Sequence, residues 1–368
     1  FSNDHREIKR IKELGLTFKP YNEVVGEITA KFDTISVCGT HGKTTTTSLL
    51  KHLFESTIGC NYFIGDGQGH IDLKNKLLVI ESDEFNRHFL AYHPKTAVIT
   101  CVELEHTEIY KDLADTIETF EKFANKAELV VANGDDKNIR QIKFNNKVIF
   151  YGENSDNDYI IKNIKLESDG SHFDLYEKDK LLSNFFVPLY GHHMVMNTAA
   201  SIIVALQNNL TVEEIKKLLE NFKNAARRFA IEEVNGTIIV DDYAHHPTEI
   251  KATYNSLKNK KYNKSWAIFQ PHTYSRTANL LEDFAHSLLN FDNIIVVDIY
   301  AAREKNTYNI SSKDLVDKLV SFGANAKYIP EFNETVEYLK QNVKENDIVL
   351  TLGAGTVTKI GPMLKDAD

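Results

Sequence analysis

A short glycine-rich segment near the start of the chain carries the strongest chemical signal. Gly39, Gly42, Lys43 and Thr44 follow the β-branched run 35–37 and precede a helical pattern. Glycines let successive backbone N–H groups point at phosphate oxygens, and the N-terminus of the helix adds partial positive charge. Lys43 would then lie against the β- and γ-phosphates, and the Thr44 hydroxyl would ligate Mg²⁺. The segment therefore predicts an ATP–Mg²⁺ site.

An ordinary strand-to-helix turn is the alternative interpretation of this segment. The generic nucleotide-loop pattern is only partly met, since it would place a glycine where Val37 stands. Gly-Lys-Thr at such a junction nevertheless favours phosphate binding. Helix-start chemistry explains the hydroxyls of residues 45–47, although Thr45 also remains a candidate for nucleotide contact. Replacing Lys43 with Ala is expected to abolish ATP turnover while leaving thermal stability nearly unchanged.

Composition narrows the class of protein. The chain has 368 residues, 42% of them hydrophobic, which is enough for two or three domain cores. A formal net charge of -9 disfavours a nucleic-acid partner. No apolar run of about 18 residues and no export leader are evident, so we expect a cytoplasmic protein without membrane insertion. Three scattered cysteines predict buried thiols rather than disulfides or a metal site.

The elements that must position the loop alternate between short β-branched runs and amphipathic helices, which is typical of a parallel sheet covered by helices. We predict an α/β protein: a P-loop-type, mainly parallel central sheet with helices and a small antiparallel β subsheet over 33–224, then a Rossmann-like α/β domain over 225–368. Predicted strands of the central domain lie at 35–37, 77–80, 97–99 and 129–131, with antiparallel strands at 160–161, 173–175 and 185–187. Those of the second domain lie at 237–240, 267–269, 294–297 and 348–351.

Residues 1–32 have a different pattern. A helix over 4–14 and a short strand over 16–18 are predicted, but together they cannot bury a core. We expect this segment to be the last piece of a domain, with its linker, whose beginning precedes Phe1.

Several further blocks accompany the loop, and together they resemble the Mur ligases along the whole chain. The blocks are Gly39–Thr44, Glu81–Glu84, Glu103–His106, Gly191–Asn197, Arg227–Phe229, Asp241–Pro247 and Phe269–Arg276. His41 and the Asp-Asp-Tyr-Ala-His-His-Pro block are similar to the members that add L-alanine. The resemblance implies that the domain preceding this chain holds the uridine nucleotide.

The resemblance assigns roles to individual side chains of the central domain. Nucleotide contacts would come from Gly39, Thr40, His41, Gly42, Lys43, Thr44, Thr45 and Asn197. Metal ligands would be Thr44, Glu81 and His106. Glu81 also ends a predicted strand at the edge where open α/β sheets bind ligands, and a lone carboxylate suits Mg²⁺. An exposed glutamate and a structural histidine are the alternatives for Glu81 and His106.

Roles in the second domain are assigned in the same way. Arg228 would meet the nucleotide phosphates, or else form a domain-boundary ion pair. Asp242, which closes the first predicted strand of that domain, would contact nucleotide. Tyr243, His245 and Arg276 would bind the amino acid, with Arg276 on its carboxylate.

The reaction implied is ATP-driven amide formation between UDP-N-acetylmuramate and L-alanine through an acyl phosphate. Positioning and charge neutralisation by Lys43, Arg228 and Mg²⁺ would carry catalysis without a protein nucleophile. His245 is the candidate for the base that accepts the amine proton. The alternatives are a recycling ligase that adds a murein peptide, a folylpolyglutamate-synthase-like ligase, and a P-loop ATPase of another class. We expect a monomer or homodimer.

Overall fold

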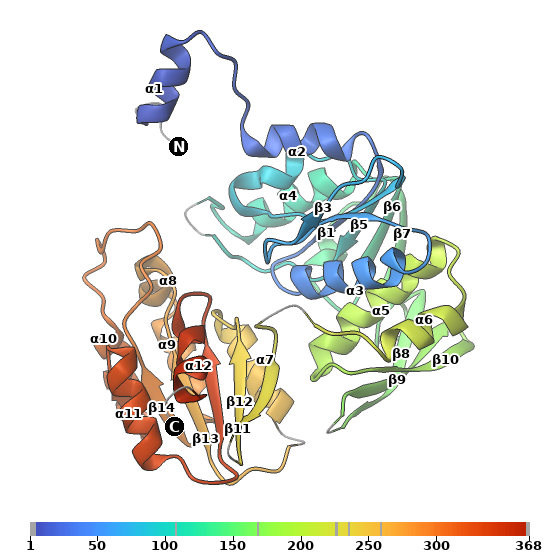
Figure 1. The fold of residues 1–368 in the computed structure, drawn as a ribbon. Coiled ribbons are helices and arrows are strands. Elements are labelled where there is room, and N and C mark those ends of the chain that lie inside the picture. The colour runs from blue at the N-terminus through green and yellow to red at the C-terminus, as the bar shows by residue number, and fades with distance from the viewer. Residues whose placement is uncertain are drawn as a thin grey trace. The chain divides into compact units, whose positions relative to one another are not determined.

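The computed structural model describes residues 5–106, 109–167, 169–224, 227–234, 236–257 and 260–365. Its contacts divide the chain into two compact units, which are described separately. Unit 1 comprises Phe1–Lys162, Leu175–Ser183 and Met196–Leu218, and unit 2 comprises Asn163–Asp174, Asn184–Val195 and Leu219–Asp368. A ten-stranded and a six-stranded sheet form the framework (Figure 1).

The strands of the first sheet are β1 (Asp33–Cys38), β2 (Asn61–Phe63), β3 (Gly69–His70), β4 (Leu77–Glu81), β5 (Thr96–Ile99), β6 (Leu129–Asn133), β7 (Lys147–Gly152), β8 (Tyr159–Leu166), β9 (Ser171–Glu177) and β10 (Lys180–Val187). Their order is β10-β9-β8-β7-β6-β5-β1-β4-β2-β3. The pairs between β2 and β7 are parallel, and β3 runs antiparallel to β2. A connection of two residues joins β9 to β10, so these neighbours are antiparallel, and the predicted antiparallel subsheet is confirmed.

Helices cover both faces of the parallel strands (Figure 1). They are α2 (Tyr21–Thr29), α3 (Lys43–Glu55), α4 (Leu113–Ala124), α5 (His192–Gln207) and α6 (Val212–Leu219), with the 3₁₀ turns η1 (Phe85–Ala91) and η2 (Ile139–Gln141). α1 (Arg6–Glu13) is not one of them, since none of its residues is buried. The core between the sheet, α2 and α4 contains Val25, Phe120 and Phe123 with strand residues such as Ile99. Because the central strands are buried on both faces, they appear in the sequence as continuous apolar runs.

The second sheet comprises β11 (Ala230–Val234), β12 (Thr237–Asp242), β13 (Ser265–Phe269), β14 (Asn293–Val296), β15 (Ala326–Tyr328) and β16 (Ile348–Leu352). Its order is β11-β12-β16-β13-β14-β15, and all pairs are parallel except β11 with β12. The helices are α7 (Pro247–Leu257), α8 (Tyr274–Asn279), α9 (Leu281–Leu288), α10 (Ser312–Ser321), α11 (Phe332–Asn342) and α12 (Ile360–Lys365), with the 3₁₀ turn η3 (Val357–Lys359).

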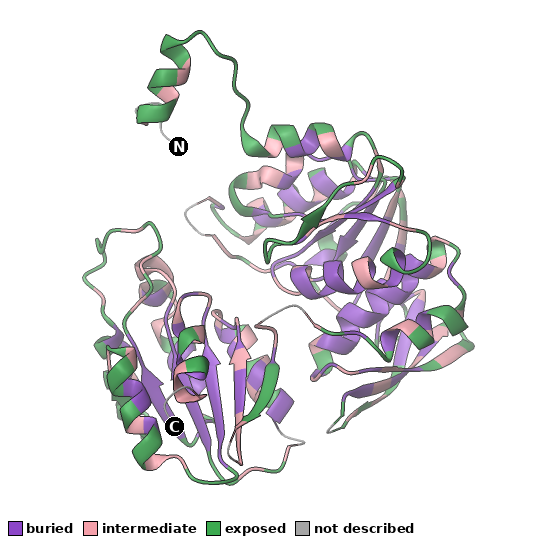
Figure 2. Cartoon of the chain, viewed as in Figure 1, coloured by how far each residue is buried: buried purple, intermediate pink, exposed green. Residues whose placement is uncertain are grey.

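Two separate apolar clusters, one on each face, hold the second sheet. One includes Ile250 of α7, Phe284 of α9 and Leu315 of α10. The other includes Leu339 of α11 and Ile360 of α12. Figure 2 shows the same arrangement, with buried strands and exposed residues on the outer sides of the helices. A mainly parallel sheet covered on both faces confirms the predicted Rossmann-like α/β architecture.

Three sequence expectations need correction. The strand predicted at 16–18 is absent, because Leu16 and Phe18 are 58% and 48% exposed and have no neighbouring strand. α2 was not predicted. β11 was not predicted either, so Asp242 closes the second strand of its sheet rather than the first. Within the described part of the chain, no helix is long and apolar enough to span a membrane.

Candidate active site

The glycine-rich loop lies between the carboxyl end of β1 and the start of α3, as predicted. Gly42 is the N-cap of α3 and has a left-handed backbone, with φ of 85°. Gly39 has φ of 135°, and a Cβ there would lie 2.1 Å from Thr100 Oγ1. Only glycine meets both demands without strain. The loop therefore has the tight backbone that a phosphate-binding turn requires.

Residues after β5 hold this loop in place. Thr40 N–H donates to the Cys101 carbonyl at 3.0 Å, and the Thr40 hydroxyl accepts from the Glu103 N–H at 2.8 Å. The His41 N–H points at Cys101 Sγ at 3.2 Å. The His41 ring lies 3.6 Å from a Glu103 carboxylate oxygen. Cys101 thus has a structural role in the loop that the sequence did not reveal.

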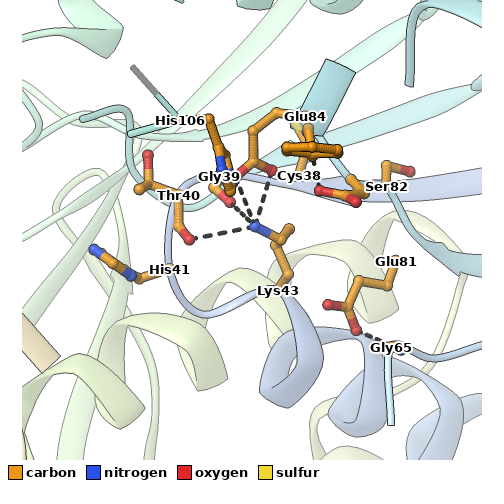
Figure 3. A network of polar contacts seen from close by, with 12 residues as sticks. Cys38, Gly39, Thr40, His41, Lys43, Gly65, Glu81, Ser82, Glu84 and His106 are labelled. Carbon is orange, nitrogen blue, oxygen red and sulfur yellow. Dashed lines mark hydrogen bonds and ion pairs between the residues drawn. The ribbon is translucent and has the colours of Figure 1, made fainter. Parts of the chain in front are cut away.

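Lys43 is the first residue of α3, and its ammonium group points back into the loop (Figure 3). Its Nζ donates to the Gly39 carbonyl at 2.7 Å and to the Thr40 carbonyl at 3.3 Å. It also contacts both carboxylate oxygens of Glu84, at 3.0 and 2.8 Å. Burial alone would lower the pKa of Lys43, but the Glu84 charge outweighs it and raises that pKa, so Lys43 is a cation.

Glu84 is the residue that sequence reasoning missed. Its side chain is 4% exposed, against 15% for that of Lys43. It belongs to the quoted block 81–84, which was the available signal, but only the folded chain shows that it is buried. Glu84 Oε1 also lies 4.0 Å from His106 Nε2. Glu84, Glu105 and His106 bring one potential metal-ligand atom each within 4.8 Å of one another.

The predicted metal ligands fall into two groups. Thr44 Oγ1 donates to Glu81 Oε1 at 3.0 Å, and Glu81 Oε2 accepts from the Gly65 N–H at 2.7 Å. His106 instead lies beside Glu84, with its ring edge-on to Phe85 at 5.0 Å between centroids. Its φ of 54° is uncommon for a residue with a side chain, and such backbone conformations cluster at functional sites.

The remaining nucleotide candidates of unit 1 are both buried. Thr45 lies in the first turn of α3 and is 3% exposed. Asn197 of α5 is 5% exposed, and a Cβ on Gly42 would lie 2.6 Å from its Oδ1. The Asn197 amide therefore packs directly against the loop.

Unit 2 presents its candidates at the carboxyl ends of β12 and β13. Asp242 ends β12, and its carboxylate accepts from the Ala244 N–H at 2.8 Å. Burial raises the pKa of Asp242 to about 6, an effect that the nearby Arg228 charge opposes. The Arg228 guanidinium lies over the Tyr243 ring at 5.0 Å.

The predicted amino-acid contacts are linked through His272, to which the sequence gave no role. His245 Nδ1 lies 3.0 Å from the Tyr243 carbonyl and 3.2 Å from Glu249 Oε2. The His245 ring is edge-on to His272 at 5.7 Å. Arg276, in α8, places Nη1 3.3 Å from His272 Nδ1.

The comparisons with known proteins identify the family of this chain. The model of the Mur ligase middle domain matches residues 37–205, and that of the Mur ligase glutamate ligase domain matches residues 226–355. The chain is 37% identical over 368 residues to a UDP-N-acetylmuramate–L-alanine ligase of Lactiplantibacillus plantarum, covering all of this chain and 83% of that protein. The chain belongs to the Mur ligase family.

Other relatives and solved structures extend the comparison. A ligase of the same name from Lacticaseibacillus paracasei is 38% identical over 361 residues, covering 98% of this chain and 81% of that one. The structure of UDP-N-acetylmuramate–alanine ligase from Thermotoga maritima superposes with a TM-score of 0.84 at 23% identity, covering all of this chain and 83% of that one. A murein peptide ligase from Psychrobacter arcticus gives 0.71 at 20% identity, covering 100% and 84%. At these identities the two structures confirm the fold.

Proposed function

We propose that this chain catalyses the ATP-dependent joining of L-alanine to the lactyl carboxylate of UDP-N-acetylmuramate, a cytoplasmic step of peptidoglycan synthesis. The observation that carries the proposal is the 37% identity, along the whole chain, to a ligase of that name. The loop between β1 and α3 supports it, because its glycine backbone and the Lys43 cation suit the phosphates of ATP.

The chemistry follows from the weakness of a carboxylate as an electrophile. The lactyl carboxylate attacks the γ-phosphorus of ATP, which gives an acyl phosphate and ADP. The amine of L-alanine then attacks the acyl carbon, an amide forms, and phosphate leaves. Lys43 would neutralise charge on the transferred phosphoryl group, and the permanently charged, planar guanidinium of Arg228 suits the same task.

Magnesium fits the donors of unit 1. The Thr44 hydroxyl and the Glu81 carboxylate are oxygen ligands held 3.0 Å apart, and Mg²⁺ prefers one or two such protein ligands together with waters and phosphate oxygens. When bound, the ion would neutralise phosphate charge. His106 is proposed as a ligand for a second ion.

Recognition of the amino acid is proposed for unit 2. Arginine pairs with a carboxylate through two parallel N–H donors, so Arg276 would hold the carboxylate of L-alanine. Tyr243 and His245 would contact the rest of the substrate. The contacts of His245 with the Tyr243 carbonyl and Glu249 fix the orientation of its ring.

The test is release of ADP by the purified full-length protein with UDP-N-acetylmuramate and a panel of L-alanine, glycine, L-serine and a murein tripeptide. We expect turnover that depends on both the sugar nucleotide and L-alanine, and none with Lys43→Met. Turnover with the tripeptide but not with L-alanine would identify a recycling ligase instead. A rate of ATP hydrolysis that is the same with and without every acceptor would indicate an ATPase of another class.

A further inference from the structure

The Lys43 ammonium group is already saturated with acceptors inside the protein. It has three N–H donors, and four oxygens surround it: two carbonyls of the loop and both carboxylate oxygens of Glu84 (Figure 3). A phosphate oxygen can therefore bond to Nζ only if one of these acceptors leaves. The carbonyls belong to the loop backbone, so the carboxylate of Glu84 is the one that can be displaced.

The backbone around Glu84 holds that carboxylate next to Lys43. Asn86 and Arg87 have φ of 52° and 56°, two successive residues in the left-handed region that side chains disfavour. The Glu84 carbonyl accepts from the buried Tyr110 hydroxyl at 2.6 Å and from the Arg87 N–H at 2.9 Å. Arg87 in turn pairs with both carboxylate oxygens of Asp115, at 2.9 and 2.8 Å. Such strain persists only where surrounding contacts impose it.

We infer that Glu84 is a positioning residue whose carboxylate binds the Lys43 ammonium group where a phosphate of ATP would bind, and that ATP binds by displacing this carboxylate. This inference rests on the proposed role of Lys43 in binding ATP. It deepens that role, because the ion pair then sets the affinity for the nucleotide. If a nucleotide binds only when the internal ion pair is open, its apparent dissociation constant is the intrinsic one divided by the fraction of molecules in which the pair is open.

The ion pair weakens nucleotide binding, but it also stabilises the folded protein when no nucleotide is bound. It satisfies two buried charges, and loss of one partner leaves the other buried and unpaired. Removing the Glu84 charge should therefore lower stability and, at the same time, tighten ATP binding. A purely structural role predicts only the first effect, since damage to a site does not improve its affinity.

The experiment compares Glu84→Gln with the wild type and with Glu118→Gln. Glu118 forms an exposed ion pair with Lys122 on α4 of the same unit, so it is a matched loss of one carboxylate. Dissociation constants are measured by calorimetry for AMP-PNP, which carries a triphosphate, and for AMP, which lacks the β- and γ-phosphates.

We expect Glu84→Gln to bind AMP-PNP about tenfold more tightly, the factor for a pair that is open in about one molecule in ten. Binding of AMP should not change, and Glu118→Gln should match the wild type for both ligands. Unchanged or weaker binding of AMP-PNP by Glu84→Gln would overturn the inference. If Glu84→Gln does not fold, Glu84→Asp takes its place, because its shorter side chain reaches Lys43 poorly. Glu84→Asp should then bind AMP-PNP more tightly than the wild type, by less than tenfold. Unchanged or weaker binding of AMP-PNP by this variant would also overturn the inference.

Failure of the proposed function has a different signature. Lys43→Met should lose most of its affinity for AMP-PNP while keeping that for AMP. Wild-type affinity in this variant would show that Lys43 does not meet the phosphates, whatever Glu84→Gln does.

Discussion

Replacing Lys43 with Met removes the ammonium charge from a buried ion pair and leaves a side chain of similar length. The Glu84 carboxylate, 4% exposed, would remain without its partner. Breaking a buried pair in this way costs about 3–5 kcal/mol. The sequence alone predicted almost no loss of stability for a Lys43 substitution, and the ion pair changes that expectation.

The loss should depend on pH, because the stranded carboxyl group can take up a proton. Burial raises the pKa of Glu84 above its usual 4.5, and only Lys43 opposes this strongly. In the variant, the folded state then holds a proton that the unfolded state has released, so stability falls as the pH rises above 4.5, by about 1.4 kcal/mol per pH unit until the pH reaches the folded-state pKa. We expect a loss of about 1 kcal/mol at pH 5 and about 3–5 kcal/mol at pH 8.

Urea unfolding at pH 5.0, 6.5 and 8.0 measures this. The single tryptophan, Trp266, belongs to unit 2, so circular dichroism is the probe for unit 1 and fluorescence serves as an internal reference. Lys122→Met, which breaks only an exposed pair on α4, should cost less than about 0.5 kcal/mol at every pH. A Lys43→Met protein as stable as the wild type at pH 8, or one whose loss is the same at pH 5 and pH 8, would refute the reasoning.

Three further predictions follow from the geometry. Gly42→Ala should abolish ATP turnover, because its Cβ would lie 2.6 Å from Asn197 Oδ1. The control Gly67→Ala, with φ of 92° and no atom nearby, should lose only about 1–2 kcal/mol of stability. ATP turnover and thermal melting are measured for both variants. Asp242→Asn should raise stability by about 2–3 kcal/mol at pH 8 and hardly at pH 4, because the pKa of about 6 makes the buried carboxylate unfavourable at high pH; urea unfolding at the two pH values checks it. His106→Ala should lower turnover and shift its Mg²⁺ dependence to higher concentration, which a magnesium titration of ADP release shows.

Each of the three has a result that contradicts it. Equal turnover of the two alanine variants would mean that the close approach of Gly42 to Asn197 is unimportant for ATP. A stability gain for Asp242→Asn that is as large at pH 4 as at pH 8 would exclude the titration of this carboxyl group as its cause. An unchanged magnesium titration for His106→Ala would favour a structural role for that histidine.

The sequence predicted the parts of the fold that local chemistry determines. Strands such as β1 and β4 are buried on both faces, so they stand out as short β-branched runs between polar turns. The glycine-rich loop was predictable because positive φ and close approach both demand glycine.

The remaining elements depend on contacts that a sequence pattern does not encode. β11 has the sequence Ala-Ile-Glu-Glu-Val and is mostly exposed, so it lacks the apolar alternation of a half-buried strand and forms by pairing with β12. The strand expected at 16–18 has β-forming residues but no partner. In both cases, the presence or absence of a neighbouring strand decided the outcome.

The candidate site shows the same limit. Lys43 and Glu81 could be predicted because a motif or a strand end marks each of them. Glu84 could not, because its burial and its aim at Lys43 depend on the left-handed turn at Asn86 and Arg87 and on the Tyr110 hydroxyl. The grouping of Glu84, Glu105 and His106 likewise follows from tertiary structure rather than from spacing.

The close packing of Asn197 against Gly42 also has a consequence for synthesis of the protein. The loop is complete in sequence by Thr44, but its anchors at Cys101 and at Asn197 leave the ribosome much later. Contacts between such distant residues form slowly, and domains fold as units during translation. A nascent chain should therefore gain no protection from ATP until α5 has emerged, and from then on the nucleotide can stabilise unit 1 while the rest of the chain is still being made.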